Sequence, residues 1–102
     1  MLCIKARITL YNIRKVPFGN RFHPLFNFVS ESKVGGLIVL LDRNEFQPAE
    51  TAVVEIRFPI DSAEDPASRY LGDDFSVGTQ FTFDEGTPVA IGEGVVEEIL
   101  WL

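Results

Sequence analysis

Residues 78–96 read GTQFTFDEGTPVAIGEGVV. Two apolar runs flank the tetrapeptide DEGT at residues 84–87, where Gly86 supplies the backbone freedom that a tight turn needs. The stretch therefore predicts a β-hairpin. In its first arm Phe81 and Phe83 alternate with polar residues, which gives the arm one apolar face and one polar face.

The second arm is expected over residues 88–91, continuing into Gly92 and Gly94. Two glycines one residue apart leave one face of a strand without side chains, which favours a bulge, a sharp bend or the close approach of another strand. We expect a barrel corner here, and the alternative is a backbone platform for a ligand. Together with the turn residues Glu85 and Gly86, these glycines are predicted to be structural.

The chain has 102 residues, 46% of them hydrophobic, and nine are phenylalanine. That length fits one domain able to bury a core of its own, so we expect a single domain over residues 1–102. Cys3 is the one cysteine, which excludes an internal disulfide and a cysteine-built zinc site. The N-terminal residues show no signal peptide, and no apolar run reaches membrane-spanning length. We therefore expect a cytoplasmic protein without a membrane interaction.

Net charge is −6 and unevenly spread. Residues 1–50 carry seven Lys and Arg against four Asp and Glu, whereas residues 51–102 carry two against eleven. A net-negative domain is a poor general binder of nucleic acid, because phosphate contacts need clustered cations. A basic patch on the first half and an acidic surface on the second remain compatible with this composition.

Short β-prone runs separated by turn signals extend along the chain. Alternation or apolar content predicts strands over residues 2–11, 22–29, 37–41, 51–59 and 95–100, besides the hairpin. Residues 12–21, 30–33 and 42–50 are expected to be polar connections. No helical periodicity of useful length appears, so the pattern predicts an all-β antiparallel barrel or sandwich of about six strands.

The acidic segment at residues 61–74 differs from the rest of the chain. Asp65 before Pro66 is typical of a helix start, and Gly72 of a helix end. One or two helical turns are expected between them, anchored by Tyr70 and Leu71.

Catalytic patterns are absent from the sequence. His23 is the one histidine, so no two-histidine metal site can form, and no phosphate-binding loop is present. The carboxylate pairs at residues 73–74 and 97–98 are adjacent in sequence, and adjacent strand residues point to opposite faces. We therefore expect a non-enzymatic protein without metal, cofactor or nucleotide.

One group of residues combines cations and aromatic rings, the types that position phosphates and stack on bases. Its members are Arg14, Lys15, Phe18, Arg21, Phe22 and His23. They are the candidate contacts for RNA or for a protein partner, and a solvated loop is the alternative.

Several motifs, spread from about residue 5 to residue 100, resemble the third, C-terminal β-barrel domain of elongation factor Tu. That family has Thr-Pro-Phe and then Gly-Tyr-Arg-Pro-Gln-Phe-Tyr-Phe after a first strand, a long strand ending His-Pro-Ile, and the closing motifs Arg-Glu-Gly-Gly and Val-Gly-x-Gly-Val-Val. The matching runs here are VPF at 16–18, NRFHPLFNF at 20–28, FPI at 58–60, DEGT at 84–87 and IGEGVV at 91–96. The resemblance implies a small antiparallel Greek-key β-barrel.

The departures from the family bear on function. The chain has neither the GTPase domain nor the second domain, His23 stands where the family has arginine, and the turn at 84–87 has lost a cation. Relative to the family, residues 61–74 look like an acidic insertion. In the family this domain holds the T-stem of aminoacyl-tRNA and also packs on proteins. Because backbone affinity depends on charge, these changes weaken the expectation of tRNA binding and leave protein contact open.

Three hypotheses follow. The first is a binding module for a protein of the translation apparatus, in which the acidic half meets a basic partner. The second is a tRNA or RNA binder that uses Arg14, Lys15, Arg21 and His23. The third is an immunity-type protein that imitates the elongation factor to occupy a toxin.

Overall fold

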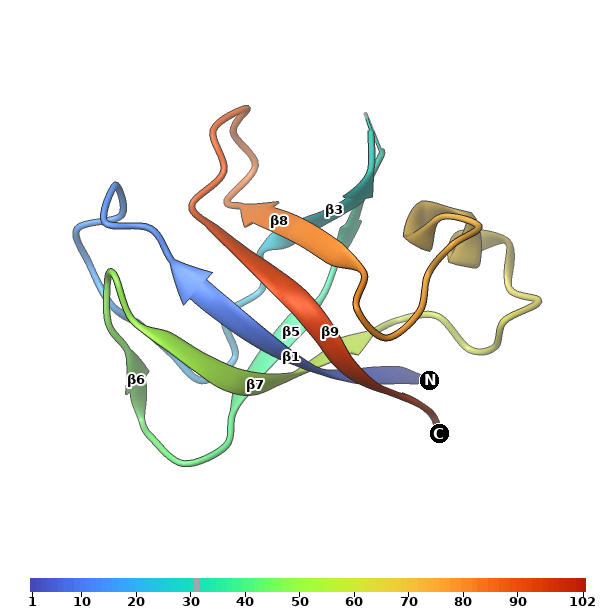
Figure 1. The fold of residues 1–102 in the computed structure, drawn as a ribbon, viewed down its shortest axis with the longest axis horizontal. Helices are drawn as coiled ribbons and strands as arrows, with labels where there is room; N and C mark the ends of the chain where they lie inside the picture. Colours follow the sequence, from blue (N-terminus) through green and yellow to red (C-terminus); the bar gives the residue numbers. More distant parts are fainter. Residues whose placement is uncertain (31) are drawn as a thin grey trace.

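The computed structural model describes residues 1–30 and 32–102, and its regular structure is β-strand except for one short 3₁₀ helix. Its elements are β1 (Leu2–Leu10), β2 (Phe18–Gly19), β3 (Leu25–Val29), β4 (Ser32–Gly35), β5 (Leu37–Leu40), β6 (Glu45–Phe46), β7 (Thr51–Phe58), η1 (Pro66–Leu71), β8 (Gln80–Asp84) and β9 (Gly92–Trp101). Seven of the strands form one antiparallel sheet in the order β4-β3-β8-β9-β1-β7-β5, and β2 pairs with β6 (Figure 1).

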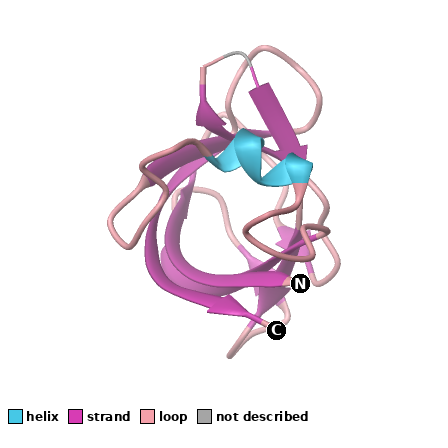
Figure 2. Ribbon diagram, turned by 90° about the vertical axis from the view of Figure 1, so that its right-hand side faces the viewer, coloured by secondary structure: helices cyan, strands magenta, loops and turns pink. Residues whose placement is uncertain are grey.

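The sheet curls until its two ends approach one another. Figure 2 shows the strands curving around a common interior, with η1 at the rim. The chain just before β3 reaches the free edge of β5: Ile38 N donates to Phe22 O at 2.9 Å, and Leu40 N donates to the Asn20 side chain at 2.8 Å. These bonds satisfy edge donors of β5. The expected small all-β, antiparallel, barrel-like fold is confirmed.

The interior is filled by alternate residues of the long strands and by phenylalanine rings. β1 contributes one unbroken face, in which every member is fully buried: Leu2, Ile4, Ala6, Ile8 and Leu10. Phe26 is the centre of the aromatic part, with its ring 5.2 Å from Phe58, 5.7 Å from Phe81 and 5.8 Å from Phe83. Such ring pairs add stability beyond the area that they bury.

Gly92 and Gly94 make room for two of these rings. Phe83 pairs with Gly92 and Phe81 with Gly94 across the β8–β9 ladder. A Cβ atom on Gly92 would lie 2.2 Å from Cζ of Phe83, and one on Gly94 would lie 2.5 Å from Cζ of Phe81. The predicted close approach is therefore confirmed, and its occupant is the ring of the partner strand.

Three expected connections proved to contain strands, and the first of them, residues 12–21, contains β2. Residues 30–33 were expected to be a polar loop, but β4 begins at Ser32 and pairs with β3. Residues 42–50 contain β6, whose Phe46 is completely buried. The polar sequences of these short strands give no strand signal, because their pairing is set by the partner strand and not by alternation. The strand predicted from Phe22 begins only at Leu25, since Pro24 has no N–H for a ladder.

The predicted hairpin has a longer connection than its sequence indicates. β8 ends at Asp84 and β9 begins at Gly92, so the second arm predicted over residues 88–91 is wrong. Pro88 lacks an N–H donor and is exposed. Pairing resumes when Ile91 N donates to Phe83 O at 2.8 Å.

A β-bulge alters the predicted direction of the carboxylate pair at residues 97–98. Lys5 pairs with Glu98 and Ala6 with Val96, so Glu97 is the extra residue of β9. As a result both carboxylates are exposed and reach cations of β1: Glu97 lies 3.1 Å from Arg7, and Glu98 lies 3.4 Å from Lys5. The expectation of opposite faces was wrong because the bulge adds a residue between two otherwise alternating runs.

The helical turn is present where the sequence predicted it, as a 3₁₀ helix. Asp65 caps it by accepting from Ala67 N at 2.9 Å, and Gly72 ends it at a φ of 87°. Leu71 is buried in the core, and Tyr70 packs against it. Within the described residues, none of the helical structure has the length and apolar character needed to cross a bilayer.

Candidate binding surfaces

The candidate residue Arg14 is engaged inside the protein. Its Nη2 atom lies 3.1 Å from Oε1 of Glu85, and its Nη1 atom donates to the carbonyl of Val16. The guanidinium also lies 5.0 Å from the centre of the Phe22 ring, a cation–π contact. Only 18% of the side chain is exposed. Arg14 thus connects the loop after β1 to the β8–β9 loop instead of offering a free charge.

Phe18 and Phe22 belong to an aromatic stack. The Phe18 ring is buried, 4.5 Å from Phe22 and 5.2 Å from Phe46. Arg14 covers the Phe22 end, and Arg43 lies 5.6 Å over the Phe46 ring at the other end. Phe18 is buried, and the half-buried Phe22 ring already contacts Phe18 and Arg14, so neither ring is free to stack on a base.

The remaining candidates, Lys15, Arg21 and His23, are exposed. Neither Lys15 nor Arg21 forms an ion pair within the described part of the chain. Arg21 also has a φ of 68°, a left-handed conformation that is costly for a residue with a Cβ. The structure therefore separates the six candidates into three internal residues and three surface residues.

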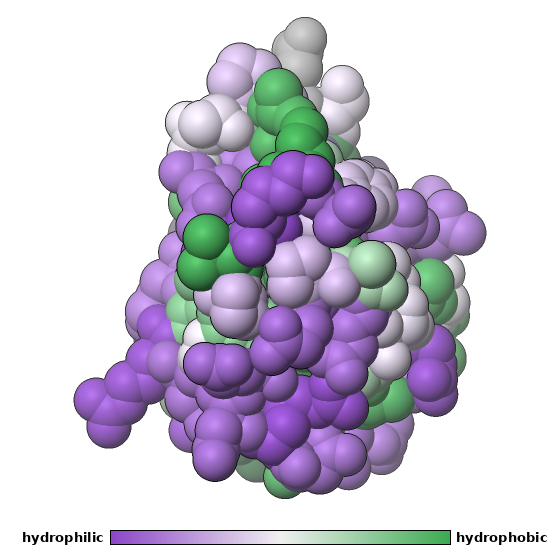
Figure 3. Space-filling view, turned by 90° about the vertical axis from the view of Figure 1, so that its left-hand side faces the viewer, coloured by the Kyte–Doolittle hydropathy of each residue, from purple (hydrophilic) through white to green (hydrophobic). Residues whose placement is uncertain are grey.

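The other cations of the barrel are paired with carboxylates. Pairs within 4 Å link Lys5–Glu98, Arg7–Glu97, Arg14–Glu85, Lys33–Asp84, Arg43–Glu50 and Arg57–Glu55. The guanidinium beside Glu55 holds the pKa of that carboxyl below its usual range, and a backbone N–H together with Arg43 does the same for the pKa of Glu50. The end of the barrel near β6 accordingly presents a mainly hydrophilic surface with separate hydrophobic patches (Figure 3).

The segment around η1 has the opposite character. Its carboxylates form what we call the acidic face: Asp61, Glu64, Asp65, Asp73 and Asp74. None of the five has a cation within 4 Å among the residues described. Asp65 caps η1 through Oδ1, which accepts from Ala67 N, while its Oδ2 accepts from Asp61 N, and these two backbone donors lower its pKa.

The one cation in this segment, Arg69, lines the same cavity as Glu64 and Asp73 but forms no ion pair among the described residues. Nη2 of Arg69 lies 3.3 Å from the Tyr70 hydroxyl, and its guanidinium lies 5.1 Å from the Tyr70 ring centre. A cavity of about 510 Å³ opens beside the helix, with Glu64 and Asp73 in its lining together with Phe75 and Trp101. Phe75 fixes this region to the barrel through an edge contact with Phe28 at 5.4 Å. The acidic face is therefore held in place by apolar anchors, while its carboxylates form no ion pair with the described cations.

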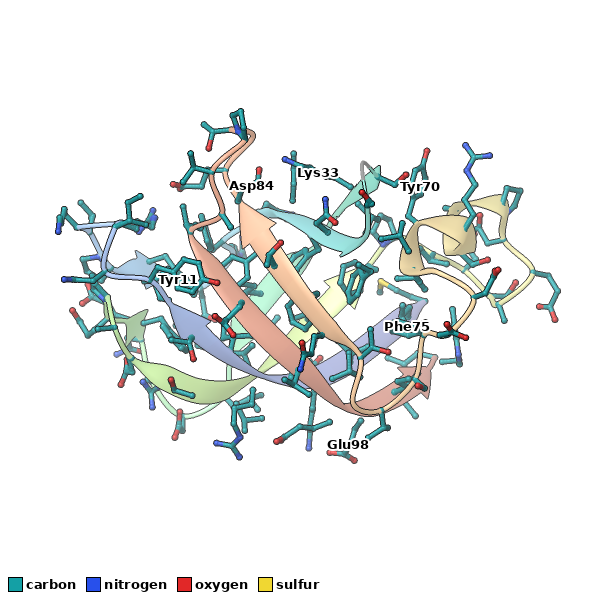
Figure 4. All side chains as sticks on the ribbon, turned by 45° about the horizontal axis from the view of Figure 1, so that its top comes forward. Tyr11, Lys33, Tyr70, Phe75, Asp84 and Glu98 are labelled. Atoms are coloured by element: carbon teal, nitrogen blue, oxygen red, sulfur yellow. The ribbon has the colours of Figure 1, made fainter. Side chains whose placement is uncertain are left out.

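Two polar pairs were missed in the sequence. Asp84 is buried at 4% exposure, with Oδ2 2.7 Å from Nζ of Lys33 and Oδ1 accepting from Gly86 N at 2.7 Å. Lys33 and Asp84 lie side by side in Figure 4. Tyr11 donates to Glu93 at 2.8 Å, and burial raises the pKa of the Tyr11 hydroxyl, with Glu93 adding to the rise. The sequence carried one signal for the pair of Lys33 and Asp84, namely an aspartate directly after the apolar first arm of the hairpin.

No protein-family model and no curated protein matches the chain.

Proposed function

We propose that the protein is a non-enzymatic binding module whose acidic face docks against the basic surface of a partner protein. The observation that carries this proposal is the distribution of charge. Six cations of the barrel are paired with carboxylates, whereas the segment at residues 61–74 concentrates five carboxylates against one arginine. Complementary charge steers association and selects partners.

The position of the acidic face supports docking of a folded partner. η1 is anchored by buried Leu71 and by Phe75 on Phe28, so its carboxylates do not need to be ordered when a partner binds. The resemblance to the third domain of elongation factor Tu, which packs on other proteins, supports a partner within the translation apparatus.

The test is capture of partners from a bacterial lysate by the tagged protein, at low and at high salt. A neutralised variant carries Glu64→Gln, Asp73→Asn and Asp74→Asn, three residues without a structural role in the fold. A control variant carries Asp42→Asn, Glu45→Gln and Glu98→Gln, exposed carboxylates of the barrel that change net charge equally. We expect a stoichiometric protein that binds the wild type and the control but is lost from the neutralised variant.

Equal recovery by all three proteins would refute docking through the acidic face. An equal loss of the captured partner from both variants would mean that binding depends only on net charge. This outcome would also contradict the proposal, because a defined interface distinguishes the two sets of carboxylates.

RNA binding is the second candidate, and the exposure of Lys15, Arg21 and His23 is the observation that favours it. It predicts that the same capture yields RNA which disappears at high salt and on Arg21→Glu. Because Arg14 is paired with Glu85, fewer cations are available for phosphate contacts than the sequence suggested.

A further inference from the structure

A groove runs along the outer side of β5, and at one end it reaches Met1 and Pro59, next to Asp61 of the acidic face. It consists of two adjoining cavities of about 630 Å³ and 420 Å³, which share His23, Leu37 and Arg57. Arg21 and Val39 line the first cavity. No residue lines both this groove and the cavity beside η1.

Two glycines, Gly35 and Gly36, line the second cavity together with Phe58 and Pro59. Gly36 leaves space for the buried interior, because a Cβ atom there would lie 2.7 Å from the Phe58 ring and 2.9 Å from the Phe26 ring. Gly35 has room for a side chain, with the nearest atom of Leu25 3.9 Å from its Cβ position.

The groove combines an apolar wall with positive charge. Leu37 and Val39 are half-buried and lie in it on the same face of β5. Arg57 donates from Nε to Glu55 at 2.8 Å, and its two terminal nitrogens donate to no oxygen of the described residues. Arg21 is exposed, and its left-handed backbone is a costly conformation of the kind that proteins retain mainly at functional positions.

We propose that this groove binds an acidic, apolar peptide segment of a partner protein. Its aliphatic side chains lie against Leu37 and Val39, and its carboxylates face Arg21 and Arg57. Charge complementarity selects the acidic residues, and burial of aliphatic groups supplies the favourable free energy. The module then presents two surfaces of opposite charge, and this second surface does not depend on the first. The apolar wall and the small number of cations favour such a peptide over RNA, which needs a longer track of cations.

The test uses three peptides and one RNA with the isotope-labelled protein. The peptides are acetyl-LELELE-amide, its glutamine analogue LQLQLQ and hexaglutamate, and the RNA is a twelve-residue oligouridine. We expect LELELE to shift the backbone amide resonances of Gly35, Leu37 and Val39. Its affinity should exceed that of either other peptide by about fivefold or more, since each lacks one of the two interactions.

Arg21→Gly and Lys15→Gln form the matched pair of variants. Glycine adopts a positive φ without strain, so Arg21→Gly removes the charge and retains the fold. We expect it to weaken LELELE binding about fivefold with no loss in melting temperature, whereas Lys15→Gln, an exposed cation outside the groove, changes the affinity less than about twofold. Equal effects of the two variants, shifts confined to other strands, equal binding of hexaglutamate, or tighter binding of oligouridine at the same amides would each overturn the proposal.

Discussion

Arg14 and Arg43 lie at the two ends of one aromatic stack, with Phe22, Phe18 and Phe46 between them. In the sequence, three of these five residues are typical of a nucleic-acid contact. The structure uses them to close one end of the barrel and to hold the β8–β9 loop. Residue type alone could not distinguish these roles, because the partners Phe46 and Glu85 are distant in sequence from Arg14.

The ion pair between buried Asp84 and the more exposed Lys33 is expected to contribute strongly to stability. Asp84→Ala removes the acceptor for Gly86 N and the carboxylate partner of Lys33, and we expect it to lower the free energy of unfolding by about 2 kcal/mol. Asp84→Asn keeps one acceptor and should cost about 1 kcal/mol. Urea unfolding measures both, with the exposed Asp42→Asn as control. A cost for Asp84→Ala no larger than that of the control would contradict this role.

Cys3 gives a prediction about pH. Burial raises the pKa of its thiol to about 11, and the neighbouring Glu55 carboxylate adds to the rise. An unfolded thiol has a pKa of about 8.5, so above that pH the unfolded chain loses its proton first. The free energy of unfolding should therefore fall between pH 9 and pH 11.

Comparison with Cys3→Ala isolates the contribution of the thiol to this pH dependence. The variant should show a smaller fall in stability over the same range in urea titrations, and the native wild type should react slowly with a disulfide reagent at pH 8. Parallel pH profiles of the two proteins would exclude a raised thiol pKa.

At the scale of elements, the strands with an alternating or apolar sequence were predictable, whereas the short polar strands were not. β1 and β7 alternate over eight or nine residues, so their sequences specify one buried face. β4 and β6 have four and two residues, and pairing with β3 and β2 defines them. The bulge at Glu97 and the length of the β8–β9 loop depend on the register between strands, which no single strand encodes.

The glycine–phenylalanine fit between β8 and β9 makes a prediction for a pair of substitutions. Gly94→Ala places a methyl group against the Phe81 ring and should destabilise the protein by about 1–3 kcal/mol. In a Phe81→Leu background Gly94→Ala should lower the free energy of unfolding by less, because the smaller leucine side chain leaves room for the methyl group. A double-mutant cycle measures the coupling. Strict additivity would mean that Gly94 is required for another reason.

At the scale of the whole molecule, the unpaired negative charge is concentrated on the acidic face. The neutralised variant with Glu64→Gln, Asp73→Asn and Asp74→Asn removes like charges that no described cation offsets. We expect its melting temperature to exceed that of the wild type at low salt, and the difference to shrink in 1 M salt, where the Debye length is about 3 Å. A difference that persists at high salt would point to a cause other than repulsion.

The all-β, barrel-like fold followed from strand spacing and turn signals, whereas the binding surfaces did not. Charge asymmetry between the two halves indicated an acidic surface, but only the pattern of ion pairs shows that most of the described barrel carboxylates have a cation within 4 Å. The groove along β5 joins side chains of three separate segments, at Arg21, Leu37 and Arg57. Such a site depends on closure of the sheet and has no signature in a linear sequence.

The central position of β1 has a consequence for synthesis in the cell. One of its two neighbours is β9, so Cys3 pairs with Leu100 across nearly the whole chain. Contacts of such high sequence separation slow folding, because a long loop must close before they form. While the ribosome is still producing residues 11–91, one edge of β1 has no partner and its apolar face is uncovered. The interval before β9 emerges is therefore when the nascent protein is most exposed to aggregation and most in need of a chaperone.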